Sequence, residues 1–127
     1  MYSVKVRDSV MIAHSLDDPF FGPAQRLHGA TFVVDVSFLS PTLNEYNVVI
    51  DIGHARDTVS AVLDGLRYRN LDELPEFEGV LSTAEHVARH IHDTVKAQLG
   101  DSFAGDLEVT LRETHDAWAS YSGRTQR

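Results

Sequence analysis

The sequence predicts an α+β fold, in which a four-stranded antiparallel sheet carries two helices on one face. Two segments with strand-like alternation come first, two segments with helical spacing follow, and two further strand-like segments close the chain. The order is therefore strand, strand, helix, helix, strand, strand (ββααββ). Adjacent strand pairs favour antiparallel hairpins, and both helices can then cover one face of the sheet.

Composition indicates a single globular domain over residues 1–127. The 127 residues are 43% hydrophobic and 24% charged, which is sufficient for one packed core. The net charge of -8 argues against nucleic acid or a membrane surface as partner, because both require clustered cations. The chain has no cysteine, no apolar run of membrane-spanning length and no signal-peptide pattern. We therefore expect a soluble, cytoplasmic protein without disulfides.

Two strands are predicted at 2–14 and 31–38, and two more at 107–113 and 117–121. In the first two strands the apolar side chains share one parity, and therefore one face. These residues are Val4, Val6, Val10, Ile12, Phe32, Val34, Val36 and Phe38. Val33 is an apolar residue on the opposite face, which favours burial of that face by self-association.

Two helices are predicted between the strand pairs. The first carries apolar residues at helical spacing over 55–66. The second is expected to begin at a capping box, with Ser82 as the N-cap and Glu85 at the third helical position. His86 and His90 lie one turn apart on this helix, and we interpret them as a solvated face rather than a metal-binding pair.

The segments Ala13-His14 and Leu27-His28-Gly29-Ala30 together suggest a metal site that lacks one ligand. Residues i and i+2 of a strand project from the same face, close enough to share an ion. A His-x-His pair and a third His from a neighbouring strand would supply the three imidazoles of a catalytic zinc site. Here Ala30 stands at the second position of the pair, and a methyl group cannot coordinate a metal.

These segments resemble the 6-pyruvoyl-tetrahydropterin synthase and 6-carboxy-tetrahydropterin synthase group of tunnelling-fold (T-fold) proteins. His14 is similar to the first zinc ligand of that family, and His28 to the start of its His-Gly-His pair. Further matches follow in the family's order, at 49–51, 66–72, 82–85 and 112–114. The resemblance implies T-fold subunits that oligomerise into a barrel as trimers, and pairs of trimers that stack into a homohexamer.

This sequence departs from the family at the zinc-binding and catalytic positions. The third zinc ligand falls on Ala30, the acid–base Cys on Ala24, and the catalytic Asp-His pair on Arg67 and Tyr68. Two histidines hold zinc poorly without another donor. Arg67 cannot act as a base, and a phenol such as Tyr68 is a poor base at neutral pH. We therefore expect no zinc, no other cofactor, and loss of the synthase reaction.

The residues that the family uses to recognise its ligand are present. Glu113 matches a carboxylate that grips the amidine-like edge of the pterin through two parallel N–H bonds, and Thr114 follows it. Thr83 and Glu85 match a second segment, which in the family lies across a subunit boundary. On sequence alone, Glu113 could also be a charged strand end, and the helix cap explains Glu85 without a ligand.

Three functions remain open at this level. The first is a protein that binds a pterin-like small molecule at subunit interfaces without the synthase reaction. The second is a diverged, metal-free enzyme that acts on a pterin by aldol-type cleavage or tautomerisation, with Tyr68, Arg67, His14 and His28 recruited for the chemistry. The third is a structural or regulatory homologue with a vestigial pocket.

Overall fold

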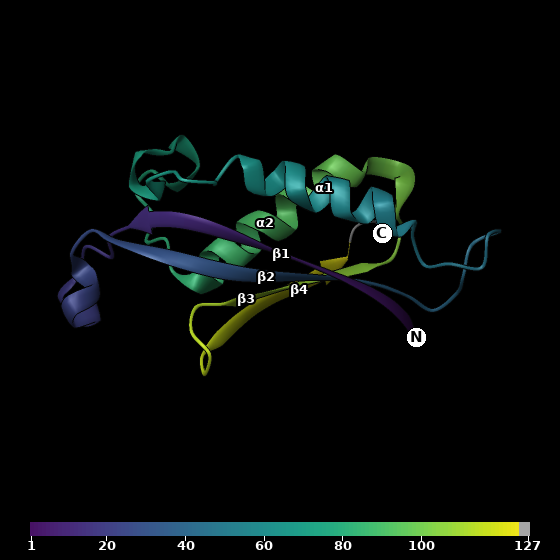
Figure 1. Ribbon diagram of the computed structural model, residues 1–127, viewed down its shortest axis with the longest axis horizontal. Helices are drawn as coiled ribbons and strands as arrows, with labels where there is room; N and C mark the ends of the chain where they lie inside the picture. Colours follow the sequence, from purple (N-terminus) through teal and green to yellow (C-terminus); the bar gives the residue numbers. More distant parts are fainter. Residues whose placement is uncertain (125–127) are drawn as a thin grey trace.

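The computed structural model describes residues 1–124 and contains a four-stranded antiparallel sheet in the order β1-β2-β3-β4. The strands are β1 (Tyr2–His14), β2 (His28–Ser40), β3 (Asp106–Arg112) and β4 (Trp118–Arg124). The helices α1 (Ile52–Asp64) and α2 (Ala84–Leu99) lie on the same face of the sheet (Figure 1). The predicted fold class and element order are confirmed. No helix among the described residues is long and apolar enough to cross a membrane.

Short 3₁₀ turns occupy the connections between these elements. They are η1 (Pro19–Gln25), η2 (Leu71–Glu73), η3 (Pro75–Phe77) and η4 (Gly100–Ser102). Strand β2 is longer than predicted, because its pairing with β1 continues to His28, which lies opposite His14. The extension brings His28 into the sheet, opposite His14.

The apolar parity of the first two strands forms the core, as predicted. Phe32, Val34, Val36 and Phe38 have no measurable exposure. They pack against the apolar faces of both helices, where the buried residues include Val59, Leu63, Val87, Ile91 and Val95. Each fully buried side chain of this kind contributes about 1.5–3 kcal/mol. The two helices therefore fix which face of the sheet is internal.

An ion-pair cluster lies on the opposite face of the sheet. Asp35 is only 3% exposed, and its carboxylate accepts from Nε of Arg7 at 2.6 Å and from Nη2 at 3.0 Å. Arg112 lies 3.8 Å from the same carboxylate and stacks over the ring of Trp118, 4.4 Å from its centroid. The hydrogen bonds from Arg7 hold the pKa of Asp35 below its usual range.

Arg67 ties the end of α1 to β1. Its Nε donates to Asp64 at 2.9 Å, its Nη1 to the carbonyl of Ser9 at 2.7 Å and its Nη2 to Asp8 at 2.7 Å. The side chain is 28% exposed. These contacts explain why the charge of Asp8 does not interrupt β1. They also give Arg67 a structural role that the sequence did not indicate.

The residues after Arg67 pair with the edge of β1. Tyr68 has a left-handed φ of 56°, and its N–H donates to the carbonyl of Met11 at 2.7 Å. The N–H of Ala13 donates to the carbonyl of Arg69 at 3.0 Å, and Ala13 forms a parallel bridge with Asn70. Residues 68–70, here called the edge segment, thus cover the edge of β1 near His14.

The start of α2 differs from the prediction. Thr83 is the N-cap, since its side chain accepts from the N–H of His86 at 3.2 Å. Glu85 is therefore the second helical residue, not the third, and lies exposed without closing a capping box. The prediction of Ser82 as N-cap was wrong because Ser82 is buried and has another partner, His14.

His86 and His90 do not form a solvated face. Both are half-buried, and the ring of Phe77 lies 5.8 Å from His86 and 5.1 Å from His90. Burial lowers the pKa of His90, and the neighbouring His86 lowers it further, against the opposite effect of Glu76. Phe77 of η3 thus packs against both histidine rings.

We expect an Arg67→Met variant to be less stable because it removes the contacts between α1 and β1 and leaves Asp8 unpaired. Urea denaturation should show a loss of about 1–3 kcal/mol in the free energy of unfolding. The matched control is Arg56→Met, since Arg56 is exposed on α1 and forms no ion pair within residues 1–124. Equal stability of the two variants would contradict this role.

We expect Asp35→Asn to lower stability at neutral pH, because it removes the ion pair with Arg7. The loss should be only about 1–2 kcal/mol, since Arg7 is largely solvated. The folded pKa of Asp35 is depressed, so its stabilisation is complete above the unfolded pKa of about 3.9 and is lost as the pH falls through the folded pKa. The variant should therefore lose less stability on acidification, as measured by circular dichroism. The matched control is Glu108→Gln, on the same face of the sheet, and its stability should fall on acidification as that of the wild type does. If the stability of Asp35→Asn fell in the same way, the argument would be refuted.

Candidate functional site

The pairing of β1 with β2 brings two histidines together. His14 lies opposite His28, and Ile12 lies opposite Ala30. The side chains of His14, His28 and Ala30 therefore leave the same face of the sheet, at the same end. The imidazole centroids are 4.6 Å apart, with an interplanar angle of 65°. The three positions that the resemblance gave as zinc ligands thus converge, and two of them carry a donor.

Carbonyl oxygens fix the hydrogen bonding of both rings. His14 Nδ1 lies 3.0 Å from the carbonyl oxygen of Ser82 and 3.0 Å from its Oγ. His28 Nδ1 lies 2.7 Å from the carbonyl oxygen of Arg26. A carbonyl oxygen only accepts, so in the neutral form of each ring we assign the proton to Nδ1. Each Nε2 is then an acceptor, and that of His14 is buried without a partner in the part of the chain described.

Burial disfavours the charged form of His14. The residue is 1% exposed, and this burial lowers its pKa, as does the neighbouring His28. The hydrogen bond to Ser82 and the charges of Asp72 and Glu113 raise the pKa, but by less. Two carboxylates from separate parts of the chain are therefore close enough to influence His14.

Glu113 presents a free carboxylate at this end of the sheet. It follows β3 directly and has the parity of Val109 and Leu111, which face the core. Its N–H donates to the carbonyl of Ala117 at 3.2 Å. The side chain is exposed, and within residues 1–124 it forms no ion pair. Figure 1 shows the β3–β4 hairpin at the same end of the molecule as η1 and the start of β2.

The other predicted ligand-binding residues have different environments. Thr114 Oγ1 accepts from the N–H groups of Asp116 at 3.2 Å and of Ala117 at 3.0 Å, so it closes the hairpin turn. Thr83 caps α2, and Glu85 is exposed on the first turn of that helix. Through Ser82, this helix start lies beside His14 of its own chain.

The positions at which the resemblance placed the family's catalytic residues do not form a cluster with the histidines. Ala24 lies in η1, where its carbonyl accepts from Leu16. Arg67 is engaged by Asp8 and Asp64. Tyr68 is 82% exposed, beside the edge of β1. Of the four residues suggested for metal-free chemistry, only His14 and His28 are brought into contact.

Sequence reasoning missed two residues of the site. Ser82 holds His14, and its only sequence signal was that Thr83 beside it can also cap a helix, although Thr is the weaker cap of the two. Asp72 accepts from both the N–H and the Oγ of Ser15, at 3.0 and 2.6 Å. It thereby supports the residue after His14, and no local pattern marks it.

The described residues do not make a three-ligand zinc site. Within residues 1–124, no group of three or more His, Cys, Asp or Glu side chains could hold a metal ion. The buried lone pair of His14 Nε2 and the carbonyl bonds to both Nδ1 atoms suit metal ligands, but the third position is the methyl group of Ala30. One subunit alone therefore supplies an incomplete donor set.

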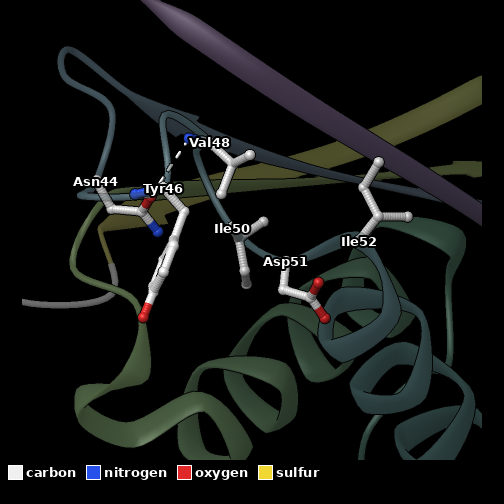
Figure 2. Close-up of a pocket in the computed structure, with 6 residues that line it drawn as sticks. All are labelled: Asn44, Tyr46, Val48, Ile50, Asp51 and Ile52. Carbon is white, nitrogen blue, oxygen red and sulfur yellow. Dashed lines mark hydrogen bonds between the residues drawn. The ribbon is translucent and has the colours of Figure 1, made fainter.

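A separate cleft lies at the other end of the sheet, between the loop after β2 and the start of α1. It has a volume of ≈ 510 Å³ and is lined by Asn44, Tyr46, Val48, Ile50, Asp51 and Ile52 (Figure 2). Asn44 Oδ1 accepts from the N–H groups of Tyr46 and Val48, and Asp51 caps α1 through the N–H of His54. These hydrogen bonds serve the local fold, and the cleft contains none of the residues described above.

Comparison with known proteins agrees with this geometry. Residues 3–124 match the family described as 6-pyruvoyl tetrahydropterin synthase. A 6-pyruvoyl tetrahydrobiopterin synthase from Dictyostelium discoideum is 26% identical over 105 residues, which is 81% of this chain and 76% of that protein. The Caenorhabditis elegans 6-pyruvoyl tetrahydropterin synthase structure has a TM-score of 0.85 at 25% identity, covering 96% of this chain and 95% of its own. The Plasmodium vivax synthase has a TM-score of 0.78 at 16% identity, covering 98% and 99%. The chain therefore belongs to the 6-pyruvoyl tetrahydropterin synthase family.

Proposed function

We propose that this protein binds a pterin-like heterocycle in a pocket between subunits and does not perform the zinc-dependent synthase reaction. The observation that carries the proposal is the exposed carboxylate of Glu113, at the end of the sheet where His14 and His28 meet. Such a carboxylate can accept two parallel N–H bonds from a ring NH and its adjacent amino group. Thr83 and Glu85 complete the pocket from a neighbouring subunit.

The two edges of the sheet support a homo-oligomer. β1 and β4 are edge strands, and soluble proteins usually cover such edges. Large apolar side chains are also exposed on these strands: Tyr2 is 52% exposed, Met11 53% and Trp118 57%. Pairing β4 of one subunit with β1 of the next would cover both edges. We propose that trimers closed in this way stack into hexamers.

Loss of the synthase reaction is supported by three positions. Ala24 and Ala30 carry methyl groups where the family resemblance placed a Cys and a zinc ligand. Arg67 holds α1 against β1 and is engaged by two carboxylates. The same engagement weakens the alternative of metal-free chemistry, because Arg67 is one of its four suggested residues.

Glu113→Gln should weaken binding of neopterin or biopterin by about tenfold or more, because an amide nitrogen would face a ring donor in place of an acceptor. Titration calorimetry measures the affinity, and Asp116→Asn, in the same exposed hairpin, is the matched control. The proposal is wrong if the wild type binds no pterin at millimolar concentration. It is also wrong if Glu113→Gln binds as tightly as the wild type.

Ala30→His should create a zinc site, because it restores a third imidazole on the face that carries His14 and His28. After growth with added zinc, elemental analysis of the purified variant should give about one zinc per subunit, and the wild type well below that ratio. Thr31→His places the new ring on the opposite face of β2 and should bind no zinc there. Stoichiometric zinc in the wild type would overturn the proposed loss of the metal.

A further inference from the structure

The outer face of the sheet, which the helices leave uncovered, carries a cluster with more positive charge than its acid can neutralise. Arg7 lies directly opposite Asp35, and Arg112 lies diagonally across from it, since its partner in β2 is Val33. The hydrogen bonds of Arg7 lower the pKa of Asp35 most, and the charges of Arg112 and Lys5 lower it as well. Three cations therefore surround one carboxylate, in a chain whose net charge is -8.

Arg112 is held in place, yet its guanidinium makes no hydrogen bond within residues 1–124. Its Nη2 lies 3.8 Å from Oδ2 of Asp35, which is close enough for an ion pair but too long for a hydrogen bond. Its Nε is buried without a partner, whereas the side chain as a whole is 33% exposed. The solvent contact therefore belongs to the far end of the guanidinium. The ring of Trp118, opposite Arg112 on β4, lies against the guanidinium and fixes its plane.

Arg7 and Lys5 also have donors that no described residue uses. The two hydrogen bonds to Asp35 occupy Nε and Nη2 of Arg7, so its Nη1 faces away from that carboxylate. Lys5 is exposed and forms no ion pair in the part of the chain that the structure describes. Glu108, on the same face opposite Ser37, forms none there either. The positive charge of the cluster is therefore not neutralised by a further acid.

We propose that Arg7, Arg112 and Lys5 bind a phosphate group on the outer face of the sheet. Three cations and one carboxylate leave a surplus of two positive charges, which matches a phosphate dianion. Guanidinium N–H groups donate in pairs to phosphate oxygens, and groups that are already oriented lose little entropy on binding. The phosphate group belongs either to inorganic phosphate or to a phosphate monoester of a small molecule.

The phosphate site is independent of the proposed function. Both helices lie on the other face of the sheet (Figure 1), and His14 and His28 have the parity of that face. The side chains of Arg7 and Arg112 have the opposite parity. All residues of the phosphate site belong to one subunit, so it does not require the proposed assembly.

Trp118 provides a direct readout in the unmodified protein, because it is the only tryptophan in the chain. Its ring is 57% exposed and lies 4.4 Å from the guanidinium carbon of Arg112. A phosphate group that binds Arg112 changes the charge beside the indole, so its fluorescence should change to saturation during titration with inorganic phosphate. Sodium chloride at equal ionic strength should give no saturating change. The same response to chloride would overturn the proposal.

Arg112→Met should weaken phosphate binding by about tenfold, as measured by titration calorimetry. Arg112→Lys keeps the charge but loses the planar fork, so it should recover only part of the affinity. The matched control is Arg89→Met, since the guanidinium of Arg89 also lies over an aromatic ring, that of Tyr121, and beside a carboxylate, that of Asp93. Equal weakening by Arg112→Met and Arg89→Met would show that only net charge matters and would refute the site.

Lys5→Met is a second variant with little risk to folding, because Lys5 is exposed. It should weaken phosphate binding by about threefold, and unchanged affinity would remove Lys5 from the site. Phenyl phosphate distinguishes the two sources of the phosphate group. Tighter binding of phenyl phosphate identifies a monoester as the ligand, and equal or weaker binding identifies inorganic phosphate. If neither binds at millimolar concentration, the phosphate site is wrong, while the proposed pterin binding on the other face is unaffected.

Discussion

The antiparallel pairing of β1 with β2, each of 13 residues, is the interaction on which the rest of the structure depends. Because side chains alternate along a strand, a slip of one residue would exchange the two faces of either strand. The observed register places Phe32 in the core, sets Arg7 against Asp35 on the outer face, and brings His14 opposite His28. Core, ion pair and candidate site are therefore fixed together by one alignment.

The periodicity of apolar residues predicted the strands and helices, because each of them must bury one side. Burial of one side requires apolar residues at regular intervals along the sequence. Contacts between distant segments leave no such trace. Arg67 binds Ser9 and Asp8, which are 58 and 59 residues away. Ser82 satisfied the local rules for a helix cap, yet it binds His14, 68 residues away, and Thr83 takes the cap. His86 and His90 became half-buried because Phe77 folds back onto them.

The candidate site likewise combines features that the sequence predicted with features that it could not predict. Family resemblance supplied the positions of His14, His28, Ala30 and Glu113, and the register shows that the first three converge. Which nitrogen of each imidazole donates and which accepts could not be predicted, because the main-chain carbonyls of Ser82 and Arg26 decide it. Any residue type at those two positions presents the same carbonyl oxygen. What the ring nitrogens can bind is thus decided by the backbone path, not by side-chain identity.

The edge segment, residues 68–70, has a consequence for assembly. It uses the outward backbone groups of Met11 and Ala13, and the side chain of Arg67 occupies the outward carbonyl of Ser9, so the edge of β1 left for another strand lies between Tyr2 and Asp8. A neighbouring strand that paired there could not slide past this point toward His14. The edge segment therefore limits the registers in which a partner strand can pair with β1. It also keeps such a strand away from the end of the sheet where the two histidines meet.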